Sequence, residues 1–470
     1  MAGKLDISKR DMQIIILMLV GAFLGSMNQM ILGPALPSIM ADLHITAADG
    51  QWLTTIFLLI NGIMIPCTAY LMARFSTRTL YLAAMLIFGV GTLCAGVARV
   101  FPMLLLARVL QALGNGILMP LLSATVLMVV PPSQRGKAMG MVGLVFSIAP
   151  AIGPSVGGFI VDAYGWNAVF LAIAPFLFID VIICAFIMPK GGETHPIPLD
   201  KVSVLLSTIG FGGLLYGFSS VGSYGWTSLH VIVPLVIGAV VVTLFVRRQN
   251  RIETPLLRFN CLKNHRFAMG MIISMVVNAA LLFGGVLMPI YLQDIHGYSA
   301  FVAALIMLPS AIVGAMVQPL AGNFYDRHGA RYLMLVGLLT MSLGSLCFVF
   351  LTKDTAIWIL VLIYTGRAMG INMIIMPLTT WAMTDFRGES VPHANAVLNT
   401  MRQVAGSVGT AIFVSIYMIV STTASSPVLE ASLSGFHFAF GAATVLSFAV
   451  VVLAYFKVEY PEKRKKPKNE

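Results

Sequence analysis

Long apolar runs separated by short polar segments dominate the sequence. A helix that crosses the hydrocarbon core of a bilayer needs about 20 mostly apolar residues. Fourteen segments meet this requirement, at residues 12–40, 48–73, 79–99, 102–130, 138–162, 168–189, 202–222, 229–247, 267–294, 299–325, 331–352, 356–384, 394–422 and 433–457. Only 10% of the 470 residues are charged, whereas soluble globular proteins carry about 25%. The sequence therefore predicts an all-α polytopic membrane protein with 14 transmembrane helices.

Lys and Arg residues are concentrated in alternate loops. With fourteen spans, 24 of the 29 fall on the side of the membrane that holds both termini. Arg99 and Lys353 fall on the other side, and Arg108, Arg367 and Arg402 lie inside spans. Basic residues in short loops remain cytoplasmic, so both termini are expected in the cytoplasm. The net charge of +11 then reflects topology and contact with anionic lipid head groups, which argues against nucleic-acid binding.

The sequence shows no pattern typical of an enzyme, and we expect no cofactor. The five cysteines have no paired spacing, so neither a disulfide framework nor a metal site is expected. No nucleotide-binding loop and no nucleophile triad is visible, which argues against an ATP-driven pump. The first apolar run is too long for the core of a cleaved signal peptide and is expected to stay as an anchor.

Two loops of the sequence resemble each other. "AYLMARFSTRTLYL" follows the second apolar run, and "AGNFYDRHGARYLML" follows the tenth. Each holds two arginines four residues apart, and the pair Arg74 and Arg78 recurs as Arg327 and Arg331 after 253 residues. The loops therefore indicate an internal repeat.

The arginines inside the fourth and twelfth spans repeat in the same way. Arg108 and Arg367 are separated by 259 residues. Both offsets fit two pseudo-symmetric six-span halves with a two-span insertion between them. We expect an N-terminal six-helix bundle at 1–190, two inserted helices with a cytoplasmic connector at 191–265, and a C-terminal six-helix bundle with a basic tail at 266–470. Many secondary transporters are built from repeated halves around a midplane site.

Three motifs resemble the major facilitator superfamily, in its fourteen-span drug:proton antiporter branch (QacA/EmrB-like). "GNFYDRHGAR" matches the family's cytoplasmic gate motif, "LLLARVLQALGNGILMP" its fourth-span motif, and "GLVFSIAPAIGPSVGGFI" its antiporter motif. The matching residues are Gly322, Asp326, Arg327, Gly329 and Arg331 in the first, Arg108, Gln111, Gly114, Gly116 and Pro120 in the second, and Gly153, Pro154, Gly157 and Gly158 in the third.

The resemblance implies a proton-coupled exporter that works by alternating access, and two departures from the family pattern bear on this. The first-half gate loop keeps Arg74 and Arg78 but has Ala73 where the family has an acid. Asn28 stands where the branch usually has an aspartate implicated in proton coupling or cation recognition. An amide cannot carry a proton in this way, so a different acid is required if the transport is proton-coupled.

Polar residues of the first and fourth spans are candidates for a substrate or proton pathway. Asn28 lies about 27 Å from the cytoplasmic end of its span and Arg108 about 9 Å from the outer end, so they are expected to meet in the outer half with Gln111 nearby. Intramembrane charges face the bundle interior or a wet cavity. The pair is therefore expected to border a water-accessible cleft. The alternative for Arg108 is a structural role in which it binds backbone carbonyls. The alternative for the amide side chains is that they join neighbouring helices.

Asp180 is the clearest acid inside a span. It lies about 18 Å from the outer end, and such acids are functional candidates, here for carrying the proton. A carboxyl packed against a polar neighbour, or one that snorkels from an outer helix, is the alternative. Two further candidates for carrying the proton lie at outer span ends, Asp294 and Asp162, with solvated rim charges as the alternative. Arg402 is expected to face either the cavity or the cytoplasmic mouth.

The gate and antiporter motifs predict moving parts. Asp326 is expected to cap a helix start and pair with basic residues, locking the cytoplasmic face with Arg327 and Arg331; a solvated turn is the alternative. Gly153 and Gly157 belong to a small-residue face that permits close helix approach, as a hinge or as ordinary packing.

The sequence thus predicts proton-coupled, secondary-active export of hydrophobic or amphipathic small molecules across a bacterial cytoplasmic membrane, a multidrug efflux and antibiotic resistance function. Its expected partners are the small-molecule substrate, protons and the lipid bilayer, and it is expected to be a monomer. One alternative is a major facilitator transporter of another cargo, such as a lipid, peptide or metabolite. The other is a transport-inactive membrane sensor or scaffold.

Overall fold

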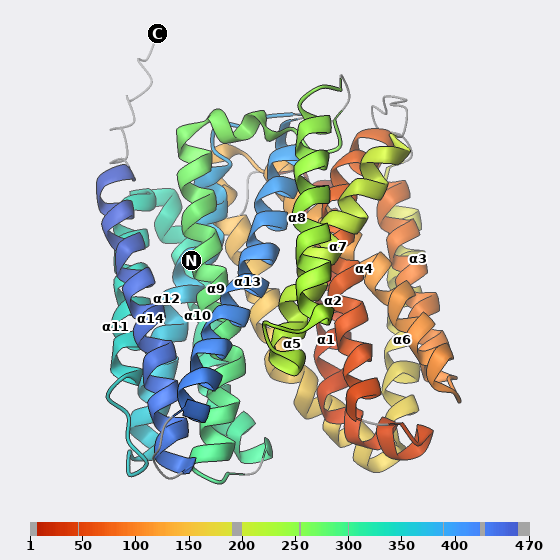
Figure 1. The fold of residues 1–470 in the computed structure, drawn as a ribbon. Coiled ribbons are helices and arrows are strands. Elements are labelled where there is room, and N and C mark those ends of the chain that lie inside the picture. Colours follow the sequence, from red (N-terminus) through yellow and green to blue (C-terminus); the bar gives the residue numbers. More distant parts are fainter. Residues whose placement is uncertain are drawn as a thin grey trace. The chain divides into compact units, whose positions relative to one another are not determined.

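A computed structural model describes residues 7–45, 47–189, 200–252, 255–298, 300–388, 390–423 and 428–458. These residues form fourteen α-helices (Figure 1). The helices are α1 (Lys9–Leu43), α2 (Ala47–Arg74), α3 (Thr77–Gly96), α4 (Phe101–Val129), α5 (Arg135–Tyr164), α6 (Trp166–Ile187), α7 (Lys201–Tyr224), α8 (Leu229–Gln249), α9 (His265–Ile290), α10 (Ala300–His328), α11 (Ala330–Phe348), α12 (Ile357–Ala382), α13 (Ser390–Thr423) and α14 (Val428–Lys457). Three shorter elements are η1 (Pro132–Gln134), η2 (Phe259–Lys263) and the π-helical turn η3 (Tyr291–Ile295).

Each predicted apolar segment coincides with one of these helices, with ends that differ by a few residues. In the part of the chain that the structure describes, 12 helices are long and apolar enough to cross a membrane. The described residues of α2 hold a shorter apolar stretch, Trp52–Met64. An all-helical polytopic membrane protein is confirmed, and membrane crossing by α2 and α5 remains a prediction.

The helices divide into two compact units. Unit 1 comprises the described residues within Met1–Pro131, Val145–Cys261 and Phe386–Ser407, and unit 2 those within Pro132–Leu144, Leu262–Asp385 and Val408–Glu470. The helices α5 and α13 each contribute residues to both units. The division predicted from the repeat, at 190 and 265, remains a prediction.

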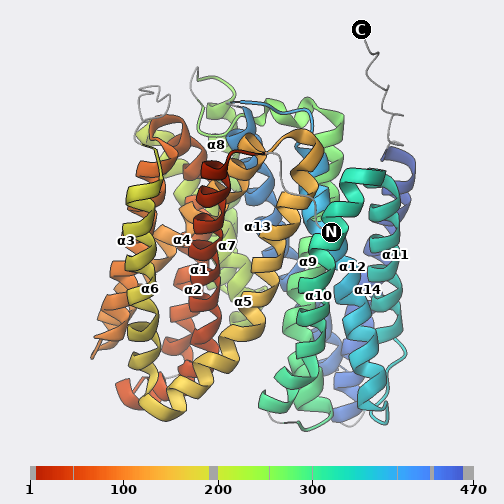
Figure 2. The ribbon, with the colours of Figure 1, turned by 180° about the vertical axis from the view of Figure 1, so that it is seen from behind.

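In unit 1, α3 and α4 pack closely, α6 lies along α3, and α1 contacts both α4 and α6 (Figure 2). Glycine makes the closest approach possible: a Cβ at Gly114 of α4 would lie 2.5 Å from the carbonyl oxygen of Ala84 in α3. Toward the outside, large apolar side chains such as Phe159 and Phe186 are exposed, as expected for surfaces that face lipid. Polar side chains between these helices are therefore enclosed by protein.

The pair α7 and α8 belongs to unit 1 and packs on α2. Glycines line the contact between the two helices, where a Cβ at Gly213 would lie 2.8 Å from the carbonyl oxygen of Pro234. Tyr216 of α7 stacks on Trp52 of α2 with 5.8 Å between ring centroids. At the base of the pair, both carboxylate oxygens of Asp200 accept hydrogen bonds from Arg248 at 2.7 and 2.9 Å.

The core of unit 2 is aromatic. Phe283 of α9 lies 4.7 Å from Phe413 of α13 and 4.9 Å from Phe440 of α14, measured between ring centroids. Phe348 of α11 contacts Phe440 at 4.6 Å. These rings join four helices around a fully buried cluster.

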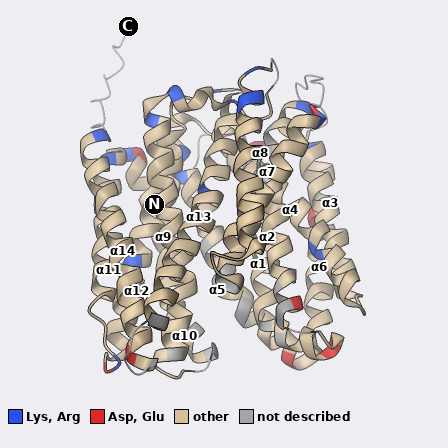
Figure 3. Ribbon diagram, in the orientation of Figure 1, with Lys and Arg blue, Asp and Glu red and all other residues tan. Residues whose placement is uncertain are grey.

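Within each unit, Lys and Arg gather at one end of the helices and are sparse along the middle (Figure 3). In the described residues, the last turns of α2, α8, α10 and α14 all carry basic residues. The pattern agrees with the loop asymmetry that predicts the cytoplasmic ends.

Candidate functional site

A polar network surrounds Arg108 in the interior of unit 1. Arg108 lies on α4, and its Nη1 donates hydrogen bonds to Gln111 Oε1 at 2.8 Å and to Asn28 Oδ1 of α1 at 3.5 Å. Its Nε donates to the carbonyl oxygen of Leu53 of α2 at 3.2 Å. The guanidinium carbon lies 4.4 Å from the ring centroid of Phe57, a cation–π contact. The predicted meeting of Asn28 and Arg108 is therefore observed.

Thr92 of α3 closes this network. Its hydroxyl oxygen accepts hydrogen bonds from Gln111 Nε2 at 3.2 Å and from Asn28 Nδ2 at 3.5 Å, and donates to the carbonyl oxygen of Phe88 at 2.9 Å. Gly91 brings α3 and α4 together here, because a Cβ would lie 2.8 Å from the backbone nitrogen of Gln111. We call Asn28, Leu53, Phe57, Thr92, Arg108 and Gln111 the Arg108 network.

The electrostatics of the Arg108 network are unusual for a buried cation. Among the described residues, no carboxylate lies within ion-pair distance of Arg108, so only neutral oxygens and one aromatic face stabilise its charge. Arg108 is 1% exposed, and Asn28 and Gln111 are 0% exposed. The water-accessible cleft predicted beside Asn28 and Arg108 is thus not present in this conformation, because α1, α2, α3 and α4 enclose the two side chains.

Asp180 lies on α6 and points toward α3. Its Oδ2 accepts a hydrogen bond from the Tyr81 hydroxyl at 2.7 Å and a weak one from the Cys184 thiol at 3.9 Å. Its Oδ1 has no hydrogen-bond partner among the residues that the structure describes, and the residue is 3% exposed. The alternative that Asp180 snorkels from an outer helix is therefore wrong: the carboxyl is packed against a polar neighbour inside unit 1.

The other predicted acids differ from Asp180. Asp162, near the end of α5, is exposed, as the rim-charge alternative requires. Asp294 belongs to the π-helical turn η3, but its side chain lies outside the described residues. Arg402 lies on α13 and is half-buried.

The gate motif of unit 2 forms a helix cap. Both carboxylate oxygens of Asp326 accept backbone hydrogen bonds at the start of α5, Oδ1 from Gly136 at 3.0 Å and Oδ2 from Lys137 at 2.8 Å. An anion is favoured there because the first N–H groups of a helix lack intrahelical acceptors and the helix dipole is positive at that end. A Cβ at Gly322 would overlap the carbonyl oxygen of Gly136. The predicted helix cap is confirmed, and the solvated-turn alternative is wrong.

Two further motif residues support this arrangement. Gly329 has φ of +80° directly before α11, a conformation that glycine adopts without strain. Arg331 Nη1 donates to the carbonyl oxygen of Val458 at 2.9 Å, and its guanidinium lies 5.3 Å from the Tyr455 ring centroid. Arg327 lies in the last turn of α10.

The corresponding loop of unit 1 makes different contacts. Arg74 donates to the Tyr70 hydroxyl at 2.8 Å, and Arg78 donates to the carbonyl oxygen of Ala185 at the end of α6. The loop has Ala73 where an acid would complete the motif. Arg78 here joins α3 to α6.

Arg367 of unit 2 has a setting that resembles that of Arg108. Its Nε donates to Ser345 Oγ of α11 at 3.0 Å, its Nη2 donates to the carbonyl oxygen of Ala280, and its guanidinium lies 5.2 Å from the Phe283 ring centroid. Ser345 follows Thr92 by 253 residues, the same offset as the two gate loops. Sequence reasoning found the arginines. It missed Ser345, which binds Arg367, and Thr92, which binds Gln111 and Asn28, although the repeat offset relates these two hydroxyls.

The antiporter motif packs α5 on α1 within unit 1. A Cβ at Gly153 would lie 3.1 Å from Met30 Cβ, and one at Gly157 would lie 2.9 Å from Ile31 Cγ1. Gly158 lies on the same helix, and the side chain of Pro154 lies outside the described residues. Close packing is observed, and the hinge role remains a prediction.

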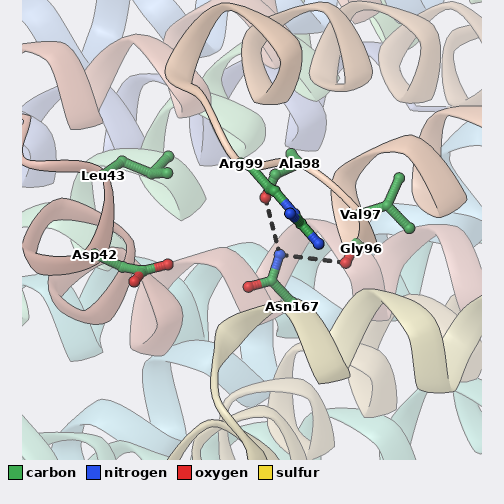
Figure 4. A pocket seen from close by; sticks show the side chains of 7 residues that line it. All are labelled: Asp42, Leu43, Gly96, Val97, Ala98, Arg99 and Asn167. Carbon is green, nitrogen blue, oxygen red and sulfur yellow. Dashed lines mark hydrogen bonds between the residues drawn. The ribbon is translucent and has the colours of Figure 1, made fainter.

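A pocket of about 470 Å³ opens where α1 ends and α6 begins. Figure 4 shows Asn167 hydrogen-bonded to the carbonyl oxygens of Gly96 and Ala98, at 3.2 and 3.1 Å. Asp42 and Arg99 stand at separate places on its wall (Figure 4). Substrate cavities for apolar molecules are lined mostly by apolar side chains, so this polar pocket does not fit such a role. The described residues hold no group of three or more His, Cys, Asp or Glu side chains placed to bind a metal.

Known proteins resemble this chain over nearly its whole length. It is 42% identical over 440 residues to the uncharacterized MFS-type transporter YcnB of Bacillus subtilis. The match covers 93% of each chain. It is 35% identical to the lincomycin resistance protein LmrB of the same organism, with 95% of each chain covered. It is 29% identical to the multidrug resistance protein B homolog of Mycobacterium tuberculosis, with 80% of this chain and 70% of the relative covered.

A solved structure shares the fold. The human organic anion transporter MFSD10 (TETRAN) superimposes with a TM-score of 0.66 at 14% identity, over 94% of this chain and 99% of that one. The family model of the Major Facilitator Superfamily matches residues 18–410. Members of this superfamily are transporters rather than enzymes. With apolar helices long enough to span a bilayer, an MFS fold and the fourth-span and gate motifs in place, the chain belongs to the major facilitator superfamily.

Proposed function

We propose that the protein exports hydrophobic or amphipathic small molecules and that proton influx drives this export. The relatives named for lincomycin and multidrug resistance support the export of drugs. The observation that carries the proposal is the Arg108 network: a buried cation with only neutral partners is costly inside a membrane protein and marks substrate or ion pathways.

The Arg108 network is suited to alternating access. The acceptors of the guanidinium come from α1, α2 and α4, so their distances depend on how these helices lie against one another. If α1 or α2 tilts away, Arg108 loses acceptors and presents free donors to water or to a polar group of the substrate. The enclosed conformation described above is then one of two states, and the open state exposes the network.

The cap that Asp326 forms on α5 acts as a latch in this proposal. Its two hydrogen bonds persist only while the start of α5 stays against the last turn of α10. Releasing the cap leaves a carboxylate and two backbone N–H groups for water to solvate. A latch of this strength holds one state without preventing exchange, since hydrogen bonds to charged groups contribute about 1.5–3 kcal/mol each.

The proposal extends to topology and assembly. All fourteen helices cross a bacterial cytoplasmic membrane, both termini lie in the cytoplasm, and the transporter works as a monomer of the fourteen-span drug:proton antiporter branch. The basic ends of α2, α8, α10 and α14 and the bacterial relatives support this arrangement.

A second cargo class is favoured by one observation. Because Asn28 stands beside Arg108 without a carboxylate, the Arg108 network keeps a net positive charge. Such a site favours neutral or anionic amphiphiles, including lipids or carboxylated metabolites, over lipophilic cations.

The deciding experiment is a susceptibility panel in a bacterial host that lacks its own efflux pumps. The panel includes lincomycin, lipophilic cations, and neutral and anionic amphiphiles, each with and without a protonophore. We expect raised resistance to several compounds that the protonophore abolishes. Purified protein in liposomes with an imposed pH gradient is then expected to move protons only when an active compound is added.

Two outcomes contradict the proposal. Resistance that persists with the protonophore argues against proton coupling. No resistance to any compound, with a correctly inserted protein and no proton movement in liposomes, favours the transport-inactive sensor or scaffold.

A further inference from the structure

The buried carboxyl of Asp180 has few of the contacts that an ionised carboxylate requires. A carboxylate has four acceptor positions on two oxygens, yet only the Tyr81 hydroxyl, at 2.7 Å, is a strong donor here. Oδ1 has no partner, and the Cys184 thiol is a weak and distant one. An unpaired buried charge costs much more free energy than a neutral carboxyl with one unsatisfied atom.

In the described part of the helices packed against Asp180, no cation reaches its carboxyl. On α3, Arg78 is engaged with the carbonyl oxygen of Ala185, and on α1, Arg10 donates to the carbonyl oxygen of Ile187 at 3.4 Å. These carbonyls lie five and seven residues beyond Asp180 on α6, or about 7–10 Å along the helix. The other titratable groups that face it are Tyr81 and Cys184. Both cations therefore stand between Asp180 and the end of α6 that we assign to the cytoplasm.

The Tyr81 hydroxyl is also held by α1. It lies 3.2 Å from the carbonyl oxygen of Leu17, and a Cβ at Gly21 would overlap it. Glycine on α1 thus creates the space in which the hydroxyl reaches Asp180. The position of α1 therefore helps to fix the hydroxyl that binds the Asp180 carboxyl.

The same two helices carry the Arg108 network. On α3, Thr92 follows Tyr81 by 11 residues, which is three helical turns, so both lie on one face. On α1, Asn28 follows Gly21 by seven residues, or two turns, and also shares a face with it. The contact between α1 and α3 therefore connects the Asp180 carboxyl with the Arg108 network.

We infer that Asp180 and Tyr81 form a buried proton-binding site, and that the α1–α3 contact couples proton release there to opening of the Arg108 network. In the enclosed conformation Asp180 carries a proton. When α1 moves, water and the Arg78 guanidinium reach the carboxyl, the proton leaves toward the end of α6, and the network loses the Asn28 acceptor. This inference rests on the proposed exporter function and names the acid that replaces the aspartate absent at position 28.

Infrared difference spectroscopy of the purified protein in lipid tests the site without any substrate. A protonated carboxyl has a C=O stretching band that disappears when the group ionises. We expect such a band to vanish in Asp180→Asn, to remain in the control Asp162→Asn, and to disappear at a different pH in Tyr81→Phe. A band that is unchanged in Asp180→Asn overturns the inference.

Transport assays test the coupling. Asp180→Asn mimics the neutral carboxyl and keeps its size but cannot release a proton, so we expect loss of uphill export driven by a pH gradient. Unchanged uphill export in Asp180→Asn overturns the inference while the exporter function stands. If the wild type moves no substrate but the Asp180 band titrates, the exporter proposal fails and the proton site survives.

Discussion

The Nη1 atom of Arg108 lies 2.8 Å from Gln111 Oε1, one turn along α4, and 3.5 Å from Asn28 Oδ1 on α1. The link to Gln111 lies within one helix, so it does not depend on how the helices are arranged. The link to Asn28 joins two helices and is long. The arginine therefore has one neutral partner on its own helix and one that depends on the position of α1.

Removal of the Arg108 side-chain charge is expected to reduce transport strongly. Arg108→Met retains most of the side-chain volume, but it leaves the buried acceptor oxygens of Gln111, Asn28 and Leu53 without their donor, at a cost of about 1–3 kcal/mol. We expect a lower apparent Tm and, at a temperature where both proteins stay folded, a transport rate at least about tenfold lower, which corresponds to about 1.4 kcal/mol. Arg99→Met, at an exposed loop position, serves as the control. Wild-type transport by Arg108→Met contradicts the pathway role.

Asn28→Asp places a carboxylate 3.5 Å from the arginine. The new ion pair neutralises the Arg108 network, so we expect resistance to lipophilic cations to increase several-fold relative to neutral and anionic compounds. The measurement is the susceptibility panel, with Asn28→Gln as the uncharged comparison. An identical compound profile for Asn28→Asp and wild type would show that cargo does not sense this charge.

Loss of the Asp326 cap is expected to destabilise the protein more than loss of an exposed ion pair. Asp326→Ala leaves the Gly136 and Lys137 N–H groups without their acceptors, at a cost of about 1–3 kcal/mol. The control is Asp385→Ala, which removes a half-exposed partner of Arg266 and costs at most about 1 kcal/mol. Thermal unfolding in detergent measures both. Equal decreases in apparent Tm would refute the latch.

The base of the α7–α8 pair is expected to lose stability in acid. The hydrogen bonds from Arg248 hold the pKa of Asp200 well below its usual range. A lowered pKa in the folded state stabilises the protein above the unfolded pKa of about 3.9, and this contribution disappears as pH falls toward the folded value.

Asp200→Asn therefore lowers the apparent Tm at pH 7, and the difference from wild type shrinks below about pH 4. Since the Arg248 side chain is 38% exposed, solvent screening keeps the effect small. Arg248→Gln serves as the partner variant in a double-mutant cycle. A difference that stays constant from pH 7 to pH 3 rules out the ion pair as its source.

Sequence reasoning located the helices, the positively charged ends and the gate cap correctly. It missed the Leu53 carbonyl beside Arg108 and the Thr92 hydroxyl, which accepts hydrogen bonds from Gln111 and Asn28. Both lie on helices whose spans show no sign of a role in such a network. The sequence contains the repeat offset that relates Thr92 to Ser345. However, the sequence of an apolar run does not distinguish a hydroxyl that binds its own helix from one that binds a side chain of a neighbouring helix.

The sequence alone determined which segments are helices, because a bilayer forces each apolar run to satisfy its backbone hydrogen bonds within itself. It also determined which ends are basic and which glycines and acid build the α5 cap. The tertiary structure alone decided which way Asp180 and Arg108 face. In a membrane helix both the lipid-facing and the protein-facing sides are apolar, so periodicity does not orient a lone polar residue, and only the packing of α1, α3 and α6 placed Tyr81 against Asp180.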